Sequence, residues 1–560
     1  MNAKIMTAKT MKNFPITFNS RLPQSLALIA LTLISTVGPA VFIGGAQPAA
    51  AAQTKKAASA DPKSKATASA SSTRTPPPIP KAAEADAALK AALAAMPVEP
   101  WRKNKPVVPA PRPFQLPKVE TYKLENGLVI ETVEDHRFPF VTLSLAFHSG
   151  TSQEPQDMIG LASMTADLLN EGTKTKSSKE VAEAVDFIGG ALGASSDFDY
   201  TMVSGSALSP YTDRLVALMS DVVLNPSFPQ DELALNKTNL IQELTMKRSD
   251  PNFLVAERFS KVVFGAHPYS VVAPNETSIN RISQKDLIDY HAKTYIPNNA
   301  VMVIVGDFTA DKMKDLISKN FGSQWKPGTV ETATLPGTPT QAGRKIYLVD
   351  RPGSVQTAIK VGNIGIQRKD PNYFPLLVMN QILGGAANSR MFLNIREQKG
   401  YTYGAYSRMS ARKEKGSFSA EASVRTDVTG PSLQEFLYEL ERIRNTKVSD
   451  AEITSAKNYL AGSFQLGLET QGGLAQRLME AKLYNLPDNY LETYADKVMA
   501  VNVEDVRTAA RTLIDTNNLV ITAVGDAKKI KQDLELFAPV TVYDTQGKLS
   551  GADTPPPNHI

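Results

Sequence analysis

Short apolar runs alternate with amphipathic stretches between about residue 118 and residue 539. Two runs, residues 298–307 and residues 517–526, are rich in β-branched residues and bounded by turn residues, which predicts buried strands. Apolar positions of period two or of helical period predict the other elements. The expected strands are 128–132, 141–148, 345–349 and 356–361, and the expected helices are 178–188, 211–224 and 231–247.

The two buried runs mark an internal repeat. Each ends in a Gly-Asp pair, Gly306-Asp307 and Gly525-Asp526, and the pairs lie 219 residues apart. A polar, helix-like stretch follows each pair, at 310–320 and at 528–536. One Gly-Asp match would be an ordinary strand ending, but the flanking elements and the lengths of the halves match as well. We therefore predict two α+β domains built to one plan.

The composition changes at five boundaries. We expect the domains at residues 118–325 and 345–540, joined by a Gly/Pro/Thr-rich linker at 326–344. Residues 53–117 are rich in Ala, Pro and Lys, which predicts a disordered tether, although residues 84–95 have the composition of a short helix. The Pro-rich end at 541–560 is expected to be a flexible tail.

The first 52 residues have the pattern of an export signal. A basic leader precedes an apolar run at 26–45, and four alanines at 49–52 provide a cleavage site. This pattern predicts a signal peptide and a periplasmic protein. The alternative is an anchor retained in the inner membrane and facing the periplasm. The chain has no cysteine, which is compatible with an oxidising compartment.

The charge balance argues against a nucleic-acid partner. The formal net charge is +5 over 560 residues, and much of it comes from the Lys-rich N-terminal region. The hydrophobic fraction of 42% is typical of a globular protein.

A series of short motifs runs through the first half of the folded region. It comprises L-E-N-G-L at 124–128, Gly-Thr at 150–151, Gly-Leu-Ala at 160–162, N-E-G-T at 170–173, Asn-Pro at 225–226, A-H-P-Y at 266–269 and Tyr-x-Pro-Asn-Asn at 295–299. This order resembles the pitrilysin/insulinase (inverzincin) family of zinc peptidases, and in particular its bacterial, processing-peptidase-like subgroup. The resemblance implies two homologous α/β-sandwich domains of the LuxS/metallopeptidase-like kind, which form half of a clam-shell chamber.

In active members, the helix after Gly-Leu-Ala carries H-x-x-E-H. Two His on one helix face bind zinc, the Glu takes a proton from the zinc-bound water, and a distal Glu completes the ligand set. Here Ser163 and Asp167 stand at the His positions and Ala166 stands at the Glu position, while Glu243 matches the distal ligand. We therefore expect no metal and no cofactor in this chain. Binding of a hard ion by Asp167 and Glu243 is the alternative.

No replacement catalytic apparatus is visible in the sequence. The five His form no close pair, no Cys nucleophile exists, and no G-x-S-x-G motif occurs. We expect structural roles for the histidines and no peptidase activity by this chain alone.

The second half matches another part of the family pattern, at residues 383–403. The segment 394–403 reads N-I-R-E-Q-K-G-Y-T-Y and contains Arg396 and Tyr403, seven residues apart. Active members carry an Arg and a Tyr at this spacing, and the resemblance implies that they hold the substrate backbone and polarise its carbonyl. A guanidinium and a phenol are suitable donors for this task.

The resemblance implies a heterodimer. In it, Arg396 and Tyr403 act in trans on an extended or unstructured peptide, and zinc lies on a homologous partner subunit that bears H-x-x-E-H. Three alternatives remain: a purely structural subunit, a homodimer that binds peptides without cleaving them, and a peptidase with an unfamiliar metal arrangement around Asp167 and Glu243.

Overall fold

The structure is a computed structural model that describes residues 115–329 and 334–550. The predicted signal peptide, most of the tether with its expected helix at 84–95, and residues 551–560 of the tail lie outside the described residues. Among the helices of the described part, none is long and apolar enough to cross a membrane.

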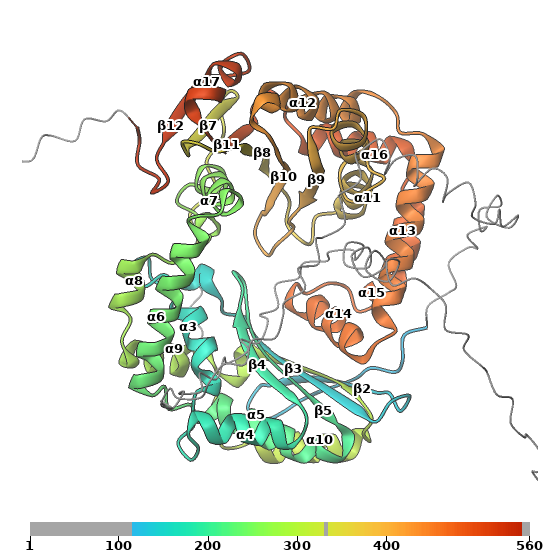
Figure 1. Cartoon of the computed structure of the whole chain (residues 1–560). Coiled ribbons are helices and arrows are strands. Elements are labelled where there is room, and N and C mark those ends of the chain that lie inside the picture. Colours follow the sequence, from blue (N-terminus) through green and yellow to red (C-terminus); the bar gives the residue numbers. More distant parts are fainter. Residues whose placement is uncertain (1–114, 330–333, 551–560) are drawn as a thin grey trace, which may run out of the picture. The chain divides into compact units, whose positions relative to one another are not determined.

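The first half forms a six-stranded mixed sheet with the order β1-β2-β6-β3-β5-β4 (Figure 1). β2 and β6 are parallel, and the other neighbours are antiparallel. The strands are β1 (Glu120–Lys123), β2 (Val129–Glu134), β3 (Phe140–Phe147), β4 (Ala191–Ser196), β5 (Thr201–Leu208) and β6 (Ala300–Gly306).

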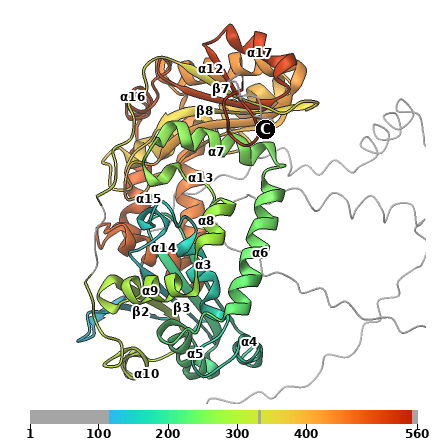
Figure 2. The same ribbon diagram turned by 90° about the vertical axis from the view of Figure 1, so that its left-hand side faces the viewer.

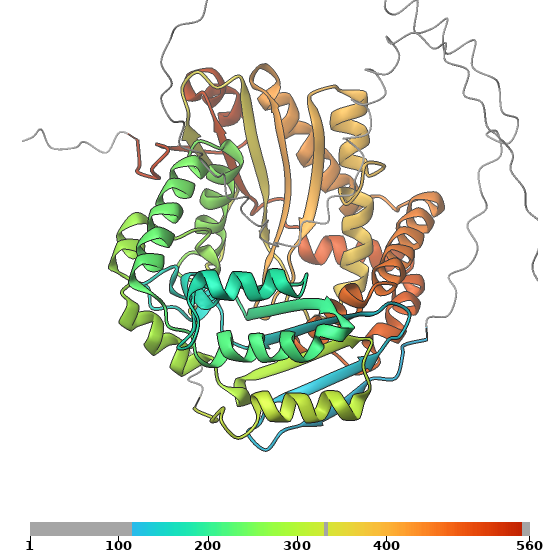
Figure 3. The same ribbon diagram turned by 60° about the horizontal axis from the view of Figure 1, so that its bottom comes forward.

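Helices of the first half cover one face of this sheet, as the teal and yellow-green helices in Figure 3 show. Those that contact its strands are α3 (Leu161–Asp167), α4 (Ser178–Phe187), α5 (Thr212–Leu224) and α10 (Ala310–Phe321). Beside them lie α6 (Gln230–Lys247), α8 (Glu276–Arg281) and α9 (Gln284–Thr294), and α7 (Pro251–Phe264) lies elsewhere. Short 3-10 turns connect them: η2 (Thr151–Gln153), η3 (Leu168–Asn170), η4 (Ser209–Tyr211), η5 (Pro268–Ser270) and η6 (Pro297–Asn299).

The second half repeats the same plan with the strand order β12-β7-β11-β8-β10-β9. Its strands are β7 (Lys345–Asp350), β8 (Gln356–Ile364), β9 (Thr402–Met409), β10 (Ser417–Arg425), β11 (Val520–Gly525) and β12 (Val540–Tyr543). Its helices are α11 (Tyr373–Leu383), the π-helix η7 (Phe392–Gln398), the turn η8 (Thr426–Val428), α12 (Thr429–Asn445), α13 (Asp450–Leu468), α14 (Gln471–Leu483), α15 (Tyr490–Ala500), α16 (Val503–Leu513) and α17 (Ala527–Glu535).

The predicted α+β fold with two similar halves is confirmed. The two runs chosen as buried strands are β6 and β11, and they take the same place in their sheets, between the counterparts β2/β3 and β7/β8. The other predicted elements begin and end within a few residues of the observed ones. The predicted domain boundaries stay predictions.

The halves exchange one helix each. α14 of the second half packs on β3 and β6 of the first sheet, and α7 of the first half packs on β8 and β11 of the second sheet. Figure 1 shows α14 on the face of the first sheet opposite α5 and α10, and Figure 2 shows α7 along the second sheet. In β6, Met302 and Ile304 belong to the core formed with the first half's own helices. The alternating residues Val301, Val303 and Val305 belong to the core on the other face, which contains α14. This two-sided burial explains why β6 is apolar throughout.

The L-E-N-G-L motif has a structural role. Gly127 has a φ of 99°, and a Cβ there would lie 2.8 Å from Cβ of Asn298, so a larger residue would be strained and crowded. The side chain of Asn126 donates to the carbonyl oxygens of Phe321 (2.7 Å) and Gly322 (2.9 Å) at the end of α10. The motif therefore ties the entry of β2 to the last helix of its half.

Candidate functional site

The helix α3 carries Ser163, Ala166 and Asp167, which are predicted to match the zinc-motif positions. It begins after Gly160, which provides no side-chain cap. The carboxylate of Glu154 takes that role by accepting from the backbone N–H of Gly160 (3.0 Å) and of Ala162 (2.6 Å). Burial raises the pKa of Glu154 to about 7, although the two backbone hydrogen bonds oppose this shift. Glu154 thus fixes the start of the helix that presents the site.

The three replaced positions have different environments on α3. Ser163 is half-buried and Asp167, one turn further on, is exposed, so both lie on the accessible face of the helix. Ala166 is buried, with 1% of its area exposed. A buried methyl group has no proton acceptor, so the residue at the predicted general-base position cannot take a proton from water.

Asp167 is solvent-accessible, yet protein surrounds its carboxylate closely enough to perturb it. Loss of hydration is the first cause that raises its pKa to about 6. Asn236 of α6 opposes this shift by hydrogen bonding, and the charges of Glu243 and Glu171 add to it. Asp167 is therefore an acidic group that titrates close to neutral pH.

Glu243 lies on α6 and forms an ion pair with Lys247 one turn further along (2.8 Å), with 54% of its side-chain area exposed. This local pair is of the solvated helix-surface kind. Among the described residues, no group of three or more His, Cys, Asp or Glu side chains has an arrangement that could hold a metal ion. The chemistry of the set points the same way, because a hydroxyl and two carboxylates are poor ligands for zinc.

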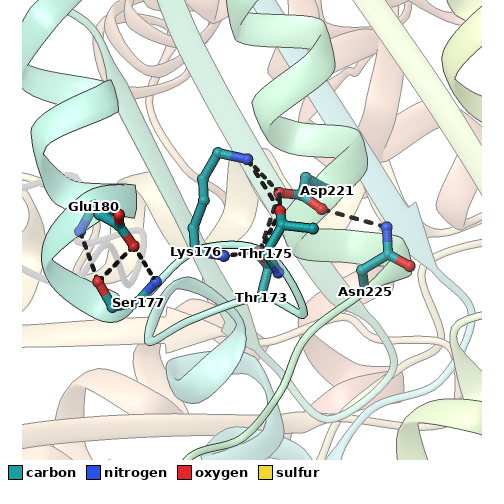
Figure 4. Close-up of polar contacts among 7 residues, drawn as sticks. All are labelled: Thr173, Thr175, Lys176, Ser177, Glu180, Asp221 and Asn225. Carbon is teal, nitrogen blue, oxygen red and sulfur yellow. Dashed lines mark hydrogen bonds and ion pairs between the residues drawn. The ribbon is translucent and has the colours of Figure 1, made fainter.

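The loop after α3 is held by one carboxylate, that of Asp221 on α5. Figure 4 shows Thr173, Thr175 and Lys176 converging on it, at 3.0, 3.3 and 2.8 Å. The same loop continues into α4, where Ser177 and Glu180 form a reciprocal capping box (Figure 4). The N-E-G-T motif is therefore part of a rigid support behind α3.

Strand β4 forms the edge of the first sheet beside α3. Every residue of β4 is at least partly exposed, and the space above the Cα of Gly193 is open. The side chain of Asn170 donates to the carbonyl oxygen of Leu192 on this strand (3.0 Å). An edge strand can offer its remaining unpaired backbone groups to another extended chain.

In the second half, the π-helix η7 carries Arg396. Asn394, 7% exposed, anchors this helix by donating to Glu435 and to Glu439 of α12, both at 2.9 Å. Gly400 then ends the helix with a φ of 64°, and its N–H donates to the carbonyl oxygen of Arg396 (2.9 Å). The turn that follows leads directly into β9 and Tyr403.

A β-bulge sets the direction of Tyr403. Ala405 pairs with Ala422 and Thr402 pairs with Val424, so β9 has one more residue than β10 across this stretch. The hydroxyl of Thr402 replaces lost ladder contacts by donating to the carbonyl oxygen of Ser423 (2.6 Å). Tyr403 projects from this bulge with 90% of its area exposed.

Arg396 is also accessible, with 41% of its side-chain area exposed. Its guanidinium pairs with Glu397 (2.5 Å) and lies 4.7 Å from the ring centroid of Phe392. An exposed pair of neighbours is weak and leaves the guanidinium able to rearrange. Its role and that of Tyr403 in substrate binding stay predictions.

Four histidines lie among the described residues; three of them make a hydrogen bond within the protein, and the fourth, His148, is largely buried. His136 binds Asp307 (2.7 Å), His267 accepts from the N–H of Tyr269 (3.1 Å), and His291 contacts the carbonyl oxygen of Val223 (2.8 Å). Burial lowers the pKa of His291 to about 4 and, to a smaller extent, that of His148. His559 lies outside the described residues.

Sequence reasoning missed three contributors. Asp221 and Asn236 sit inside amphipathic helices, where a polar residue has the appearance of ordinary surface. Glu154 lies between the Gly-Thr and Gly-Leu-Ala motifs, but its capping of α3 could be recognised only from the missing side-chain cap at Gly160.

Comparison with known proteins agrees with this architecture. A family model described as insulinase (peptidase family M16) matches residues 129–271, and one described as peptidase M16 inactive domain matches residues 281–460. An uncharacterized zinc protease of Mycobacterium tuberculosis is 28% identical over 389 residues, which is 69% of this chain and 89% of that protein. A non-peptidase homolog, YmxG, of Helicobacter pylori is 24% identical over 402 residues, which is 71% of this chain and 92% of that protein.

Among solved structures, the peptidase M16 inactive domain from Pseudomonas fluorescens superposes with a TM-score of 0.69 at 27% identity. The match covers 73% of this chain and 98% of that one. The resemblance inferred from the motifs is thereby confirmed over both halves. The chain belongs to the insulinase (peptidase M16) family, and Ser163, Ala166 and Asp167 stand at its predicted zinc-motif positions.

Proposed function

We propose that the chain is the zinc-free subunit of a heterodimeric M16 metallopeptidase. In this complex the partner is a homologue that bears H-x-x-E-H and its zinc. Arg396 and Tyr403 of this chain bind the peptide and stabilise the developing oxyanion in trans, across a chamber that both subunits enclose. The pattern of the first 52 residues favours a periplasmic location for the complex.

The observation that carries this proposal is the exposure of Tyr403. A large aromatic side chain that is 90% exposed contributes little to the core of its own domain. The local backbone is nevertheless ordered by Thr402 and Gly400 so that the ring projects outward. Tyr403 is thus a well-placed phenol without a task inside the described chain.

The proposed ligand is an extended peptide. The open edge of β4 offers backbone hydrogen bonds to such a chain without strong demands on its side chains. The guanidinium of Arg396 and the hydroxyl of Tyr403 can both donate hydrogen bonds, and a peptide carbonyl and a tetrahedral oxyanion accept them.

The test is to purify the full chain alone and together with an H-x-x-E-H homologue encoded near it, and to assay the cleavage of unstructured peptides. We expect activity only for the pair. Arg396→Ala and Tyr403→Phe should each lower kcat by about 10² to 10³ while the complex still assembles, because each removes one oxyanion donor.

Control variants are Arg281→Ala and Tyr438→Phe, which change an Arg with 56% of its side-chain area exposed and a Tyr that is 53% exposed. Both should leave kcat unchanged. If all four variants are equally active in an intact complex, the chain is a purely structural subunit. Chelator-sensitive activity of the chain alone would overturn the proposal and favour a metal arrangement around Asp167 and Glu243.

A peptide-binding subunit without catalytic contribution is the second candidate, and the open edge of β4 favours it. It predicts that unstructured peptides bind to the chain alone and that kcat of any complex does not depend on Tyr403. Isothermal titration of the isolated chain with the same peptides separates the two.

A further inference from the structure

The long helix α13 has an outward face without charged side chains. Its buried face includes Leu460 and Phe464, which pack against α11, α14 and α15. The exposed positions after the first residue fall on one stripe of the helix. They are Ala451, Thr454, Ser455, Tyr459, Ser463 and Leu466.

The charged residues that α13 does contain after Asp450 are used internally. Glu452 pairs with Arg390, and Lys457 donates to the carbonyl oxygens of Met499 and Val501. By contrast, the exposed positions of α10 are Asp311, Lys312, Lys314, Asp315, Ser318 and Lys319, which is the usual composition of a solvated helix face. The stripe on α13 therefore has the composition of a covered surface.

Two large apolar side chains and a hollow lie on this stripe. Tyr459 is 46% exposed and Leu466 is 71% exposed, and the space above the Cα of Gly462 between them is open. A surface hollow of about 730 Å³ lies beside Ala451, Ser455 and Tyr459. Small residues flanked by larger apolar ones permit the close approach of another helix.

A buried polar atom beside the stripe also lacks a partner. A second cavity, of about 90 Å³, is lined by Ser455, Tyr459 and Arg390. Arg390 is 6% exposed, and among the described residues its Nη1 has no hydrogen-bond partner, although Nε and Nη2 bind Glu452. A buried donor without an acceptor is costly. The unpaired Nη1 of Arg390, an observation independent of the stripe, indicates that a segment bound at this surface supplies a hydrogen-bond acceptor.

The described chain begins close to the C-terminal end of α13. The register of β1 on β2 places Lys118 opposite Glu134, and the next residue, Asp135, accepts from Gln471 at the start of α14 (2.9 Å). Only Glu469 and Thr470 separate α13 from α14. The first described residues therefore lie beside the end of this helix.

The sequence before residue 115 includes a segment with a matching face. Residues 84–96 read E-A-D-A-A-L-K-A-A-L-A-A-M, in which Ala85, Leu89, Ala92, Leu93 and Met96 share one helical face. A helix of this length is marginal alone, so it needs an apolar surface to form. The intervening residues 97–114 contain six prolines and span about 56 Å as polyproline II, more than the length of about 28 Å of α13.

We propose that the outward face of α13 is the docking site of the chain's own residues 84–96, which pack on it as a helix with Leu89 and Leu93 against Tyr459 and Leu466. The segment also supplies acceptors, Glu84 and Asp86, for the unpaired nitrogen of Arg390.

The absence of cysteine makes a direct test possible on the full-length chain. Ser455→Cys is labelled with a maleimide reagent, alone and in combination with Leu89→Asp and Leu93→Asp. Docking protects Ser455→Cys, so the double aspartate change should raise its labelling rate at least tenfold. The matched control is Lys314→Cys on α10, whose rate should not respond to the aspartates.

A second measurement identifies the occupant. Ala92→Cys combined with Ser455→Cys, and in a second variant with Ser463→Cys, is treated with a short bismaleimide at several protein concentrations. Crosslinks within one chain, independent of concentration, are expected. Equal labelling rates with and without the aspartates would overturn the proposal. Crosslinks only between chains, or protection only in the presence of the H-x-x-E-H homologue, would assign the face to a second copy or to the partner.

Discussion

The two halves share one plan but present different chemistry at the ends of their sheets. In the first half, the zinc-motif positions on α3 hold a buried methyl, a half-buried hydroxyl and a carboxylate. In the second half, Asn394 and Gly400 fix the backbone around Arg396 and Tyr403, whose side chains remain free to reach outward. The first half thus has no proton acceptor at its predicted general-base position, whereas the second half exposes an Arg and a Tyr side chain.

The same contrast appears in two carboxylates that organise helices. Glu154 caps α3 and has its pKa raised to about 7 by burial. For Glu452 near the start of α13, burial also acts to raise the pKa, but hydrogen bonds from Arg390 and Ser449 outweigh it and lower the pKa to about 2. The contributions of Glu154 and Glu452 to stability therefore change in opposite directions as the pH rises.

The largest expected effect comes from rebuilding the missing site. The triple variant Ser163→His, Ala166→Glu and Asp167→His places two imidazoles one turn apart on the accessible face of α3, with Glu243 as the third ligand. We expect one zinc ion per chain with a Kd of about 1 µM or tighter, since such sites supply large binding energies. Metal analysis and calorimetry measure this.

Ser163→His alone is the control and should bind no zinc. If the triple variant binds none either, Glu243 on α6 is not within ligand distance, and the first half has lost the site's geometry as well as its residues.

The exchange of helices predicts that a change in α14 destabilises the first half. Leu478, 5% exposed, lies on the face of α14 that carries Gln471 and Lys482, which bind Asp135 and Glu131 of the first half. Leu478→Ala should lower the free energy of unfolding by about 2–5 kcal/mol through the lost apolar contact and the cavity. Urea denaturation measures the loss, and hydrogen exchange should increase in β3 and β6.

Leu536→Ala, at a position that is 83% exposed, is the matched control and should change stability by less than about 0.5 kcal/mol. Faster exchange confined to the second sheet would contradict the assignment of α14 to the first sheet.

Glu154 should make the fold less stable as the pH rises. Below about pH 4.5 the carboxyl group is protonated in both the folded and the unfolded state, and above about pH 7 it is ionised in both. Between these values only the unfolded chain releases the proton, so the free energy of unfolding falls by about 3 kcal/mol. Glu154→Gln should remove this slope.

Glu452→Gln provides the comparison in the other half. The depressed pKa of Glu452 contributes stability above about pH 4.5 that is lost as the pH falls toward 2, so this substitution should flatten only the acid limb. Thermal denaturation at a series of pH values measures both. Identical pH profiles of the two variants would show that the two carboxylates do not differ.

The smallest effect is expected at Glu243. Because its pair with Lys247 is solvated and local, Glu243→Gln should change the free energy of unfolding by less than about 0.5 kcal/mol. A larger loss, measured by urea denaturation, would mean that Glu243 still supports the fold around α3.

Much of the fold followed from the sequence because β-branched runs and helical periodicity reflect local burial. The all-apolar pattern of β6 indicated burial on both faces, but no local signal indicates that the second cover is α14, more than 160 residues later. At the site, the motif spacing predicts that Ser163, Ala166 and Asp167 share one helix, and α3 carries all three, while their match to the zinc motif stays a prediction. The bulge that directs Tyr403 was beyond sequence reasoning, because it depends on the register between β9 and β10.

The reciprocal exchange of α7 and α14 also constrains how the chain acquires its structure. As synthesis proceeds from the N-terminus, β3 and β6 are complete about 170 residues before α14 has been made. Until then one apolar face of the first sheet has no cover, and such a surface favours aggregation. We therefore expect that neither half is stable when excised alone, because a truncation before residue 471 leaves the α14-facing side of the first sheet exposed.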